Sequence, residues 1–195
     1  MSTIVSMNYL DLSSTAFFLC DMQEKFRPAI LYFNEIAEIA QRLVTATNLL
    51  NIPLVVTEQY PKGLGPTISS LNIDHAALKQ EKTRFSMFSL EVENLLVQNS
   101  IKKVVLFGVE AHVCVLQTAI DLLNNGYGVH VVADASSSRS LTDKLYAFDR
   151  LRQAGCIVTT HESVLMQLVN DKNHEKFKEI QKLILPLAPN TGLLA

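Results

Sequence analysis

Hydrophobic and polar positions along the chain follow two alternating patterns. Short apolar runs, bounded by polar or turn-forming residues, predict β-strands; they are TAFFLCD (15–21), PLVVTEQ (53–59), KKVVLFG (102–108), GVHVVAD (128–134) and CIVTT (156–160). A less clearly marked stretch, 75–89, predicts one further short strand or extended segment. Because most of these runs are apolar throughout, they are typical of strands that are buried on both faces of a parallel sheet.

Helical spacing fills the intervals between the runs. In the segment 33–51 one face of the predicted helix collects Ile36, Ile39, Ala40, Leu43, Val44, Thr47 and Leu50. Further helices are predicted at 89–99, 111–126, 140–155, 161–170 and 173–184. Asn34, Ser89 and Ser140 are the expected N-caps, with Asp143 completing a capping box. Asn-Asn-Gly at 124–126 and Gly155 are expected to end two of the helices.

This alternation predicts an α/β fold with a three-layer, doubly wound arrangement and a mainly parallel sheet of about six strands. We expect one domain over residues 1–195, with the apolar tail 185–195 packed on that domain or on a partner subunit. In such folds the ligand lies beyond the carboxyl ends of the strands, where the strand order reverses. The candidates for chemistry are therefore the residues at strand ends: Asp21, 57–60, 108–114 and Asp134. The serines 136–138 are expected to form a tight turn.

Composition narrows the class of protein. The chain has 195 residues and a net charge of −2, with 48% hydrophobic and 18% charged residues. This charge balance argues against a nucleic-acid partner, because phosphate binding needs clustered basic residues. No apolar run is long enough to span a bilayer, and the start of the chain lacks a secretory signal pattern. The three cysteines form no CxxC pair, so a cytoplasmic protein without disulfides or zinc is expected.

Cys114 permits two interpretations. It lies in the first turn of a predicted helix, where the helix dipole and unpaired amides favour the reactive thiolate. A buried cysteine that packs against the sheet is the alternative, and the residue pattern alone favours it. Cys20 and Cys156 lie inside strand patterns and are expected in the core.

Asp21 and Lys82 are also open to two interpretations. Asp21 follows an apolar strand and could accept the proton of a thiol, or it could cap the next turn. Lys82 stands in the polar stretch KQEKTRF, which by itself indicates a solvated lysine. Sequence spacing does not show whether either residue lies near Cys114.

Three blocks in the order FLCDMQEKF, KTRFSMF and FGVEAHVCVLQTAIDL resemble the active-site blocks of the isochorismatase-like (cysteine hydrolase) superfamily. The similarity extends through VHVVADASSSRS, and FKEIQKLILPLAPNTGLL is similar to the C-terminal segment of the isochorismatase domain-containing proteins. The resemblance covers roughly residues 14 to 195. It implies a catalytic triad of Asp21, Lys82 and Cys114. It also implies a cis peptide at Val109–Glu110 and an oxyanion hole formed by the amides of Glu110 and Cys114.

The resemblance further implies an amide-like small-molecule substrate and a covalent intermediate on the cysteine. Nicotinamidase-like relatives bind a metal through histidines after the second strand, but TEQYPKG has none, so no metal and no cofactor are expected. Phe26 matches a pocket aromatic of the family, and Tyr60 and Phe85 are weaker candidates for substrate binding. A homo-oligomer is expected. The alternative function is a binding protein that keeps the fold, with an inactive or redox-active cysteine.

The roles of three polar residues close to these blocks are less defined. His112 is two positions from Cys114 and therefore on another helix face, which indicates a surface or pocket-rim role. Gln23 could contact a substrate or cap a turn, and Arg139 is expected to be solvated.

Overall fold

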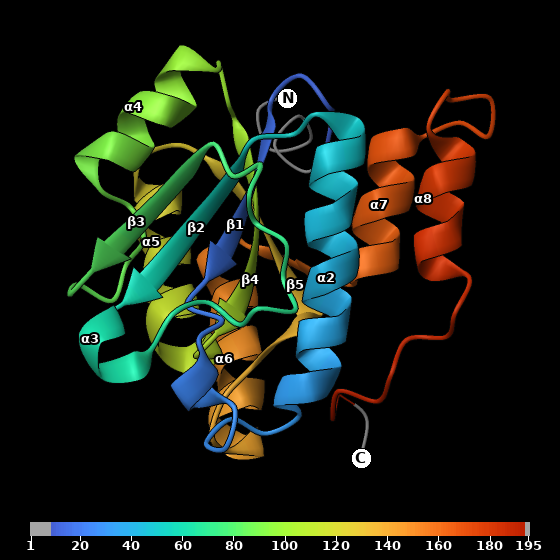
Figure 1. The fold of residues 1–195 in the computed structure, drawn as a ribbon. Coiled ribbons are helices and arrows are strands. Elements are labelled where there is room, and N and C mark those ends of the chain that lie inside the picture. Colours follow the sequence, from blue (N-terminus) through green and yellow to red (C-terminus); the bar gives the residue numbers. More distant parts are fainter. Residues whose placement is uncertain (1–8, 194–195) are drawn as a thin grey trace.

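A computed structural model describes residues 9–193 and contains one six-stranded sheet, in which every pair of neighbouring strands is parallel (Figure 1). The strands are β1 (Thr15–Cys20), β2 (Leu54–Gln59), β3 (Leu78–Lys82), β4 (Lys103–Val109), β5 (Gly128–Ser137) and β6 (Ile157–Thr159). Their order is β3-β2-β1-β4-β5-β6. The predicted doubly wound α/β fold is therefore confirmed.

Helices cover both faces of the sheet (Figure 1). The longer ones are α2 (Phe33–Leu50), α4 (Leu90–Gln98), α5 (Leu116–Asn124), α6 (Leu141–Ala154), α7 (His161–Val169) and α8 (Phe177–Ile184). The short ones are η1 (Glu24–Phe26), α3 (Pro61–Leu64) and the π-helical turn η2 (Ala111–Val115) that precedes α5. Helices α2, α7 and α8 pack on one face, and α4, α5 and α6 pack on the other.

Strand β1 shows why an unbroken apolar run is needed. Its side chains alternate between the two faces, so that Phe17 and Leu19 enter one hydrophobic core whereas Phe18 and Cys20 enter the other. All six of its residues are buried. The predicted buried face of α2 is also confirmed, since every residue named for it is buried.

The strand order reverses between β1 and β4, because the chain moves from β1 through β2 to β3 before returning to β4. At this point the carboxyl ends of two neighbouring strands lie side by side, with Cys20 paired to Gly108. Gly108 has a φ of +123°, and a Cβ on it would lie 2.1 Å from the carbonyl oxygen of Cys20. Only glycine fits here, and the close approach brings the segments after β1 and β4 together.

The helix caps were mostly predicted correctly. Ser89 and Ser140 accept hydrogen bonds from the amides of Val92 and Asp143, and Gly155 ends α6 in a left-handed conformation. The predicted cap at Asn34 is wrong: α2 begins at Phe33, after Tyr32. The Asn34 side chain instead accepts a hydrogen bond from Arg27 at 2.6 Å.

The predicted serine turn at 136–138 is also wrong, because β5 continues to Ser137 and all three serines are buried. Their hydroxyl groups find partners inside the fold. Ser136 donates to the Val132 carbonyl, Ser137 donates to the Leu31 carbonyl, and Ser138 pairs with His112. Satisfied hydroxyls let a polar sequence extend a buried strand. The last strand, β6, lies at the sheet edge and is only half-buried.

The tail after α8 packs on the helices of its own chain. Arg42 of α2 donates hydrogen bonds to the carbonyls of Pro186 and Leu187, and Lys144 of α6 donates one to the Thr191 carbonyl. Residues 194–195 of the predicted tail, and residues 1–8, lie outside the described part. No helix within residues 9–193 has the length and apolar character needed to cross a membrane.

Candidate active site

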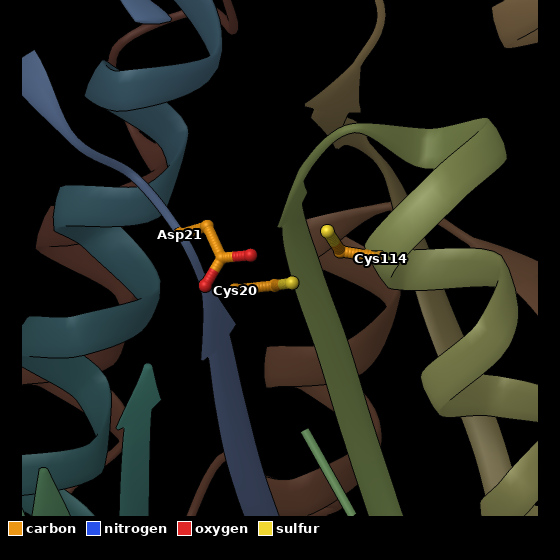
Figure 2. Close-up of side chains that lie close together, drawn as sticks. All are labelled: Cys20, Asp21 and Cys114. Atoms are coloured by element: carbon orange, nitrogen blue, oxygen red, sulfur yellow. The ribbon is translucent and has the colours of Figure 1, made fainter. Parts of the chain in front are cut away.

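The point where the strand order reverses brings together residues from three separate segments. Asp21 follows β1, Lys82 is the last residue of β3, and Cys114 lies in the π-helical turn after β4. The Nζ atom of Lys82 lies 2.7 Å from Oδ2 of Asp21. A carboxylate oxygen of Asp21 and the sulfur atoms of Cys20 and Cys114 all lie within 4.8 Å of one another (Figure 2).

Asp21 is completely buried and adopts a left-handed backbone conformation with a φ of 51°. Its Oδ1 accepts a hydrogen bond of 2.7 Å from Thr57, and its Oδ2 accepts one from Lys82. Burial raises the pKa of the Asp21 carboxyl above its ordinary value, although Lys82 and Thr57 oppose this shift. A carboxyl group whose pKa is shifted toward neutral pH is suited to accept and return a proton.

Lys82 is buried, so the interpretation of a solvated lysine is wrong. Its register opposite Gln59 carries the side chain to the edge of the sheet where the strands end. The ammonium group donates to Asp21, to Oε1 of Gln59 at 2.7 Å and to the carbonyl of Phe85 at 2.9 Å. Burial alone lowers the pKa of Lys82, but the negative charge of Asp21 and its hydrogen bond to the ammonium raise it above its ordinary value.

Cys114 is 4% exposed and lies inside the turn Ala111–Val115. Its carbonyl accepts a hydrogen bond of 2.6 Å from the Thr118 hydroxyl. The peptide bond Val109–Glu110 is cis, at the position that the resemblance implies. The Glu110 carboxylate accepts a hydrogen bond of 3.0 Å from the Arg139 amide, which joins the segments after β4 and β5. The Arg139 side chain is 67% exposed and pairs with the same carboxylate.

Cys20 is a core residue as predicted, but its thiol has a neighbour that sequence spacing did not reveal. It is completely buried, and its sulfur interacts with that of Cys114 (Figure 2). Burial raises the pKa of the Cys20 thiol well above its ordinary value, and the adjacent Cys114 and Asp21 add to this shift. Cys20 is therefore a neutral thiol at physiological pH.

The same cluster offers two sulfur atoms and one carboxylate as donors for a metal ion. Both carboxylate oxygens of Asp21, however, already accept hydrogen bonds, and one lies against the positive charge of Lys82. Near the end of β2, the carboxylate of Glu58 accepts hydrogen bonds from Thr67 and forms an ion pair with Lys79. The arrangement of these groups suits proton transfer better than the binding of a cation.

The predicted substrate-binding aromatics lie at different depths. Phe26, the last residue of η1, packs partly buried against the core. Tyr60 is 57% exposed and borders a hollow of about 310 Å³ that Lys82 also lines. Phe85 is 49% exposed and borders a separate hollow of about 350 Å³ beside Gln117. Neither hollow is lined by Cys114, so substrate contacts for Tyr60 and Phe85 remain predictions.

Several polar residues around the site make contacts that the sequence did not predict. Thr57 and Gln59 fall in the stretch flagged as a strand end, and they contact Asp21 and Lys82 respectively. Gln23 donates to the carbonyls of Gln59 and Gly65, so it holds the loop after β2. His112 is half-buried and pairs with Ser138 at 2.9 Å.

The expectation that Asp134 ends a strand is wrong, because β5 continues to Ser137, and its carboxylate has a different partner. Its carboxylate accepts hydrogen bonds from the amide and the ring of His161 at the start of α7. It thus joins β5 to a helix instead of joining the cluster around Asp21.

Two features define the class of this protein. One is the doubly wound α/β fold, and the other is the set of a thiol, a carboxylate and an ammonium group at the point where the strand order reverses. The chain belongs to the isochorismatase family, since the model of the Isochorismatase domain matches residues 15–163. Isochorismatase domain-containing protein 1 of Danio rerio is 52% identical over 193 residues, which cover 98% of this chain and 68% of that protein. Isochorismatase domain-containing protein 2 of Xenopus laevis is 49% identical over 196 residues, which cover 100% of this chain and 95% of that protein.

A solved structure agrees with this assignment. The structure described as MAR1 ribonuclease from Caenorhabditis elegans has a TM-score of 0.92 and 49% sequence identity, covering 96% of this chain and 97% of that one. The family predicted from the three sequence blocks is therefore confirmed.

Proposed function

We propose that the chain is a metal-independent cysteine hydrolase that acts on a small amide-like substrate. The observation that carries the proposal is the convergence of Asp21, Lys82 and Cys114 from three segments of the chain at the carboxyl ends of the strands. Cys114 is the nucleophile, Asp21 transfers the proton, and Lys82 holds the Asp21 carboxylate in place.

In the first half of the reaction the Cys114 sulfur attacks the carbonyl carbon of the substrate. Asp21 accepts the thiol proton and then delivers it to the leaving nitrogen, so that an amine departs and a thioester remains. The buried position of Asp21 supports this role, because its raised pKa lets it hold the proton between the two steps.

In the second half, Asp21 removes a proton from a water molecule, which attacks the thioester carbon. The acid product leaves, and the proton returns from Asp21 to the Cys114 sulfur. The amides of Glu110 and Cys114 would stabilise the negative oxygen that forms in both halves. Loss of one such donor typically lowers the rate by ~10²–10³-fold.

The proposal is tested by alkylating Cys114 with iodoacetamide across a pH series. Wild-type protein is expected to react faster than a free thiol below pH 7, because the thiol proton has an acceptor beside it. Asp21→Asn should remove this advantage while keeping the shape of the side chain. Cys156→Ala is the matched control and should leave the profile unchanged. A Cys114 that reacts no faster than a free thiol would contradict the proposal.

RNA is the second candidate substrate, because the C. elegans relative is named a ribonuclease. The buried ammonium of Lys82 is already bound by Asp21, Gln59 and the Phe85 carbonyl, which leaves it poorly placed to neutralise a phosphate. Incubation with a labelled single-stranded RNA separates the two cases. Cleavage by wild-type protein that persists in Cys114→Ser would replace the amide hydrolase proposal.

We also infer that the chain assembles as a homo-oligomer. Tyr146 of α6 is 73% exposed and Leu187 of the tail is 92% exposed, so apolar side chains are available for a contact between copies. Light scattering measures the assembly mass, and an unchanged mass after removal of residues 185–195 would exclude the tail from that contact.

A further inference from the structure

Two thiols lie at the site, but the proposed hydrolysis uses only one. Cys20 ends β1 on the same face of the sheet as Cys114, and the two sulfur atoms lie within 4.8 Å of each other. Figure 2 shows both sulfur atoms beside β4, between the strand that carries Cys20 and the helical turn that carries Cys114. The third cysteine, Cys156, follows α6 and is not a member of this cluster.

The two cysteine residues differ slightly in their exposure to solvent. Cys20 is 0% exposed, whereas Cys114 is 4% exposed. A small oxidant from solvent therefore meets Cys114 first. Cys20 stays protonated in the resting state because burial raises its pKa, and the Asp21 carboxylate lies close enough to take its proton when it reacts.

We propose that Cys20 is a resolving cysteine, which forms a reversible disulfide with Cys114 when hydrogen peroxide oxidises Cys114. This inference rests on the reactive Cys114 thiol of the proposed function, but it requires no knowledge of the substrate. The disulfide would remove the nucleophile and also protect it from irreversible oxidation to sulfinic and sulfonic acids.

The chemistry proceeds in two balanced steps. The Cys114 thiolate attacks one oxygen of hydrogen peroxide, the O–O bond breaks, and a sulfenic acid forms while hydroxide leaves and takes up a proton to become water. The Cys20 sulfur then attacks the sulfenic sulfur, so that an S–S bond forms and the S–OH bond breaks. The Cys20 proton passes through Asp21 to the departing hydroxide, which leaves as a second water. Both thiols are oxidised by two electrons in total, and one peroxide is reduced.

Closure of the disulfide requires the two sulfur atoms to move closer together. The sulfur atoms must approach to about 2.05 Å, and they begin within 4.8 Å of each other. We expect a rotation of the Cys114 side chain, together with a shift of the turn that carries it, to close this gap. Cys114 lies in a π-helical turn, whereas Cys20 is fixed in the centre of the sheet, so Cys114 is the residue that moves.

The test is peptide mapping without reductant after treatment of the full chain with hydrogen peroxide. Trypsin separates the cysteines into peptides 1–25, 104–139 and 153–172. A linked pair of peptides 1–25 and 104–139, which disappears on addition of dithiothreitol, is the expected result. Cys156→Ala should give the same linked pair in full yield. Cys20→Ala should lose it completely and should accumulate a Cys114 sulfenic acid that dimedone labels. Cys20→Ser, which keeps a similar size, guards against a packing defect in the alanine variant.

Two outcomes would overturn the inference. One is oxidation of Cys114 in wild-type protein without the linked pair, with sulfenic acid as long-lived as in the Cys20 variants. The other is a Cys114 that peroxide leaves unmodified. The first outcome, combined with rapid alkylation of Cys114 below pH 7, removes the role of Cys20 and leaves the proposed hydrolase standing.

Discussion

Within residues 9–193, two lysines are buried in different surroundings. The Nζ of Lys82 lies 2.7 Å from the Asp21 carboxylate, and its pKa is raised. Lys144 has no exposed surface, yet its ammonium donates to the carbonyl of Thr191 and lies 5.9 Å from the ring centres of Tyr32 and Phe148. Its pKa falls to about 8, because burial disfavours the charge and Asp134 only partly offsets this effect.

The comparison shows what keeps a buried lysine charged. A carboxylate in direct contact outweighs the cost of removing the ammonium from water, whereas a carbonyl and aromatic faces do not. Lys82 therefore remains a fixed positive charge beside Asp21 at every physiological pH. Lys144 instead joins α6 to the C-terminal tail, where a charge is not required.

Replacing each lysine in turn should give the largest difference in the free energy of unfolding between the two regions. Lys82→Met leaves the buried Asp21 carboxylate without its cation, and losing one partner of a buried ion pair costs about 3–5 kcal/mol in the free energy of unfolding. Lys144→Met, the matched control, loses one hydrogen bond to a carbonyl but also removes the cost of burying an ammonium, and it breaks no ion pair, so it should cost at most about 1 kcal/mol. Urea titrations of both variants measure the difference. Equal costs would show that contact with Asp21 does not set Lys82 apart.

The second prediction concerns pH. Below about pH 8 the Lys144 ammonium is protonated in both the folded and unfolded states, and the folded state bears the full cost of burying it. Between about pH 8 and the ordinary value of 10.5, the unfolded chain binds more protons, so the stability from this group rises with pH. The rise should amount to at most about 3 kcal/mol.

Unfolding curves of the wild type and Lys144→Met across this pH range isolate the contribution, because every other titrating group is shared. The stability of the wild type relative to the variant should increase with pH. A constant difference between the two proteins would mean that Lys144 keeps an ordinary pKa in the fold.

The smallest effect is expected at Gln59, which supplies one neutral acceptor to Lys82. Gln59→Leu keeps the contact between Lys82 and Asp21 but removes a hydrogen bond to a charged group. Such a loss lowers the free energy of unfolding by at most about 1.5–3 kcal/mol. Gln59 is half-buried, so we expect solvent to replace part of the bond and the cost to be near 1 kcal/mol. Urea titration checks the stability, and a loss as large as that of Lys82→Met would show that Gln59 and not Asp21 anchors the lysine.

The layered fold could be predicted from the chain alone, because it depends on local and repetitive signals. Apolar runs such as residues 15–20 and 102–108 indicate strands buried on both faces, and the periodic face of α2 indicates a helix packed on them. The helix caps at Ser89 and Ser140 could also be predicted, since a cap involves residues three positions apart. The turn expected at the serines 136–138 was wrong because the partners of Ser137 and Ser138, the Leu31 carbonyl and His112, are distant in sequence.

What the sequence determined by itself was therefore the order of strands and helices, the three blocks of the family, and Asp21, Lys82 and Cys114 as candidates. Only the tertiary structure decided that Lys82 is buried against Asp21 and that the thiol of Cys20 lies beside Cys114. The physical reason is that helix and strand patterns reflect neighbours a few residues apart. The charge of a lysine and the reactivity of a thiol depend instead on groups that the strand order brings together from distant parts of the chain. Asp21 and Lys82 are 61 residues apart (82 − 21), and Cys20 and Cys114 are 94 residues apart (114 − 20).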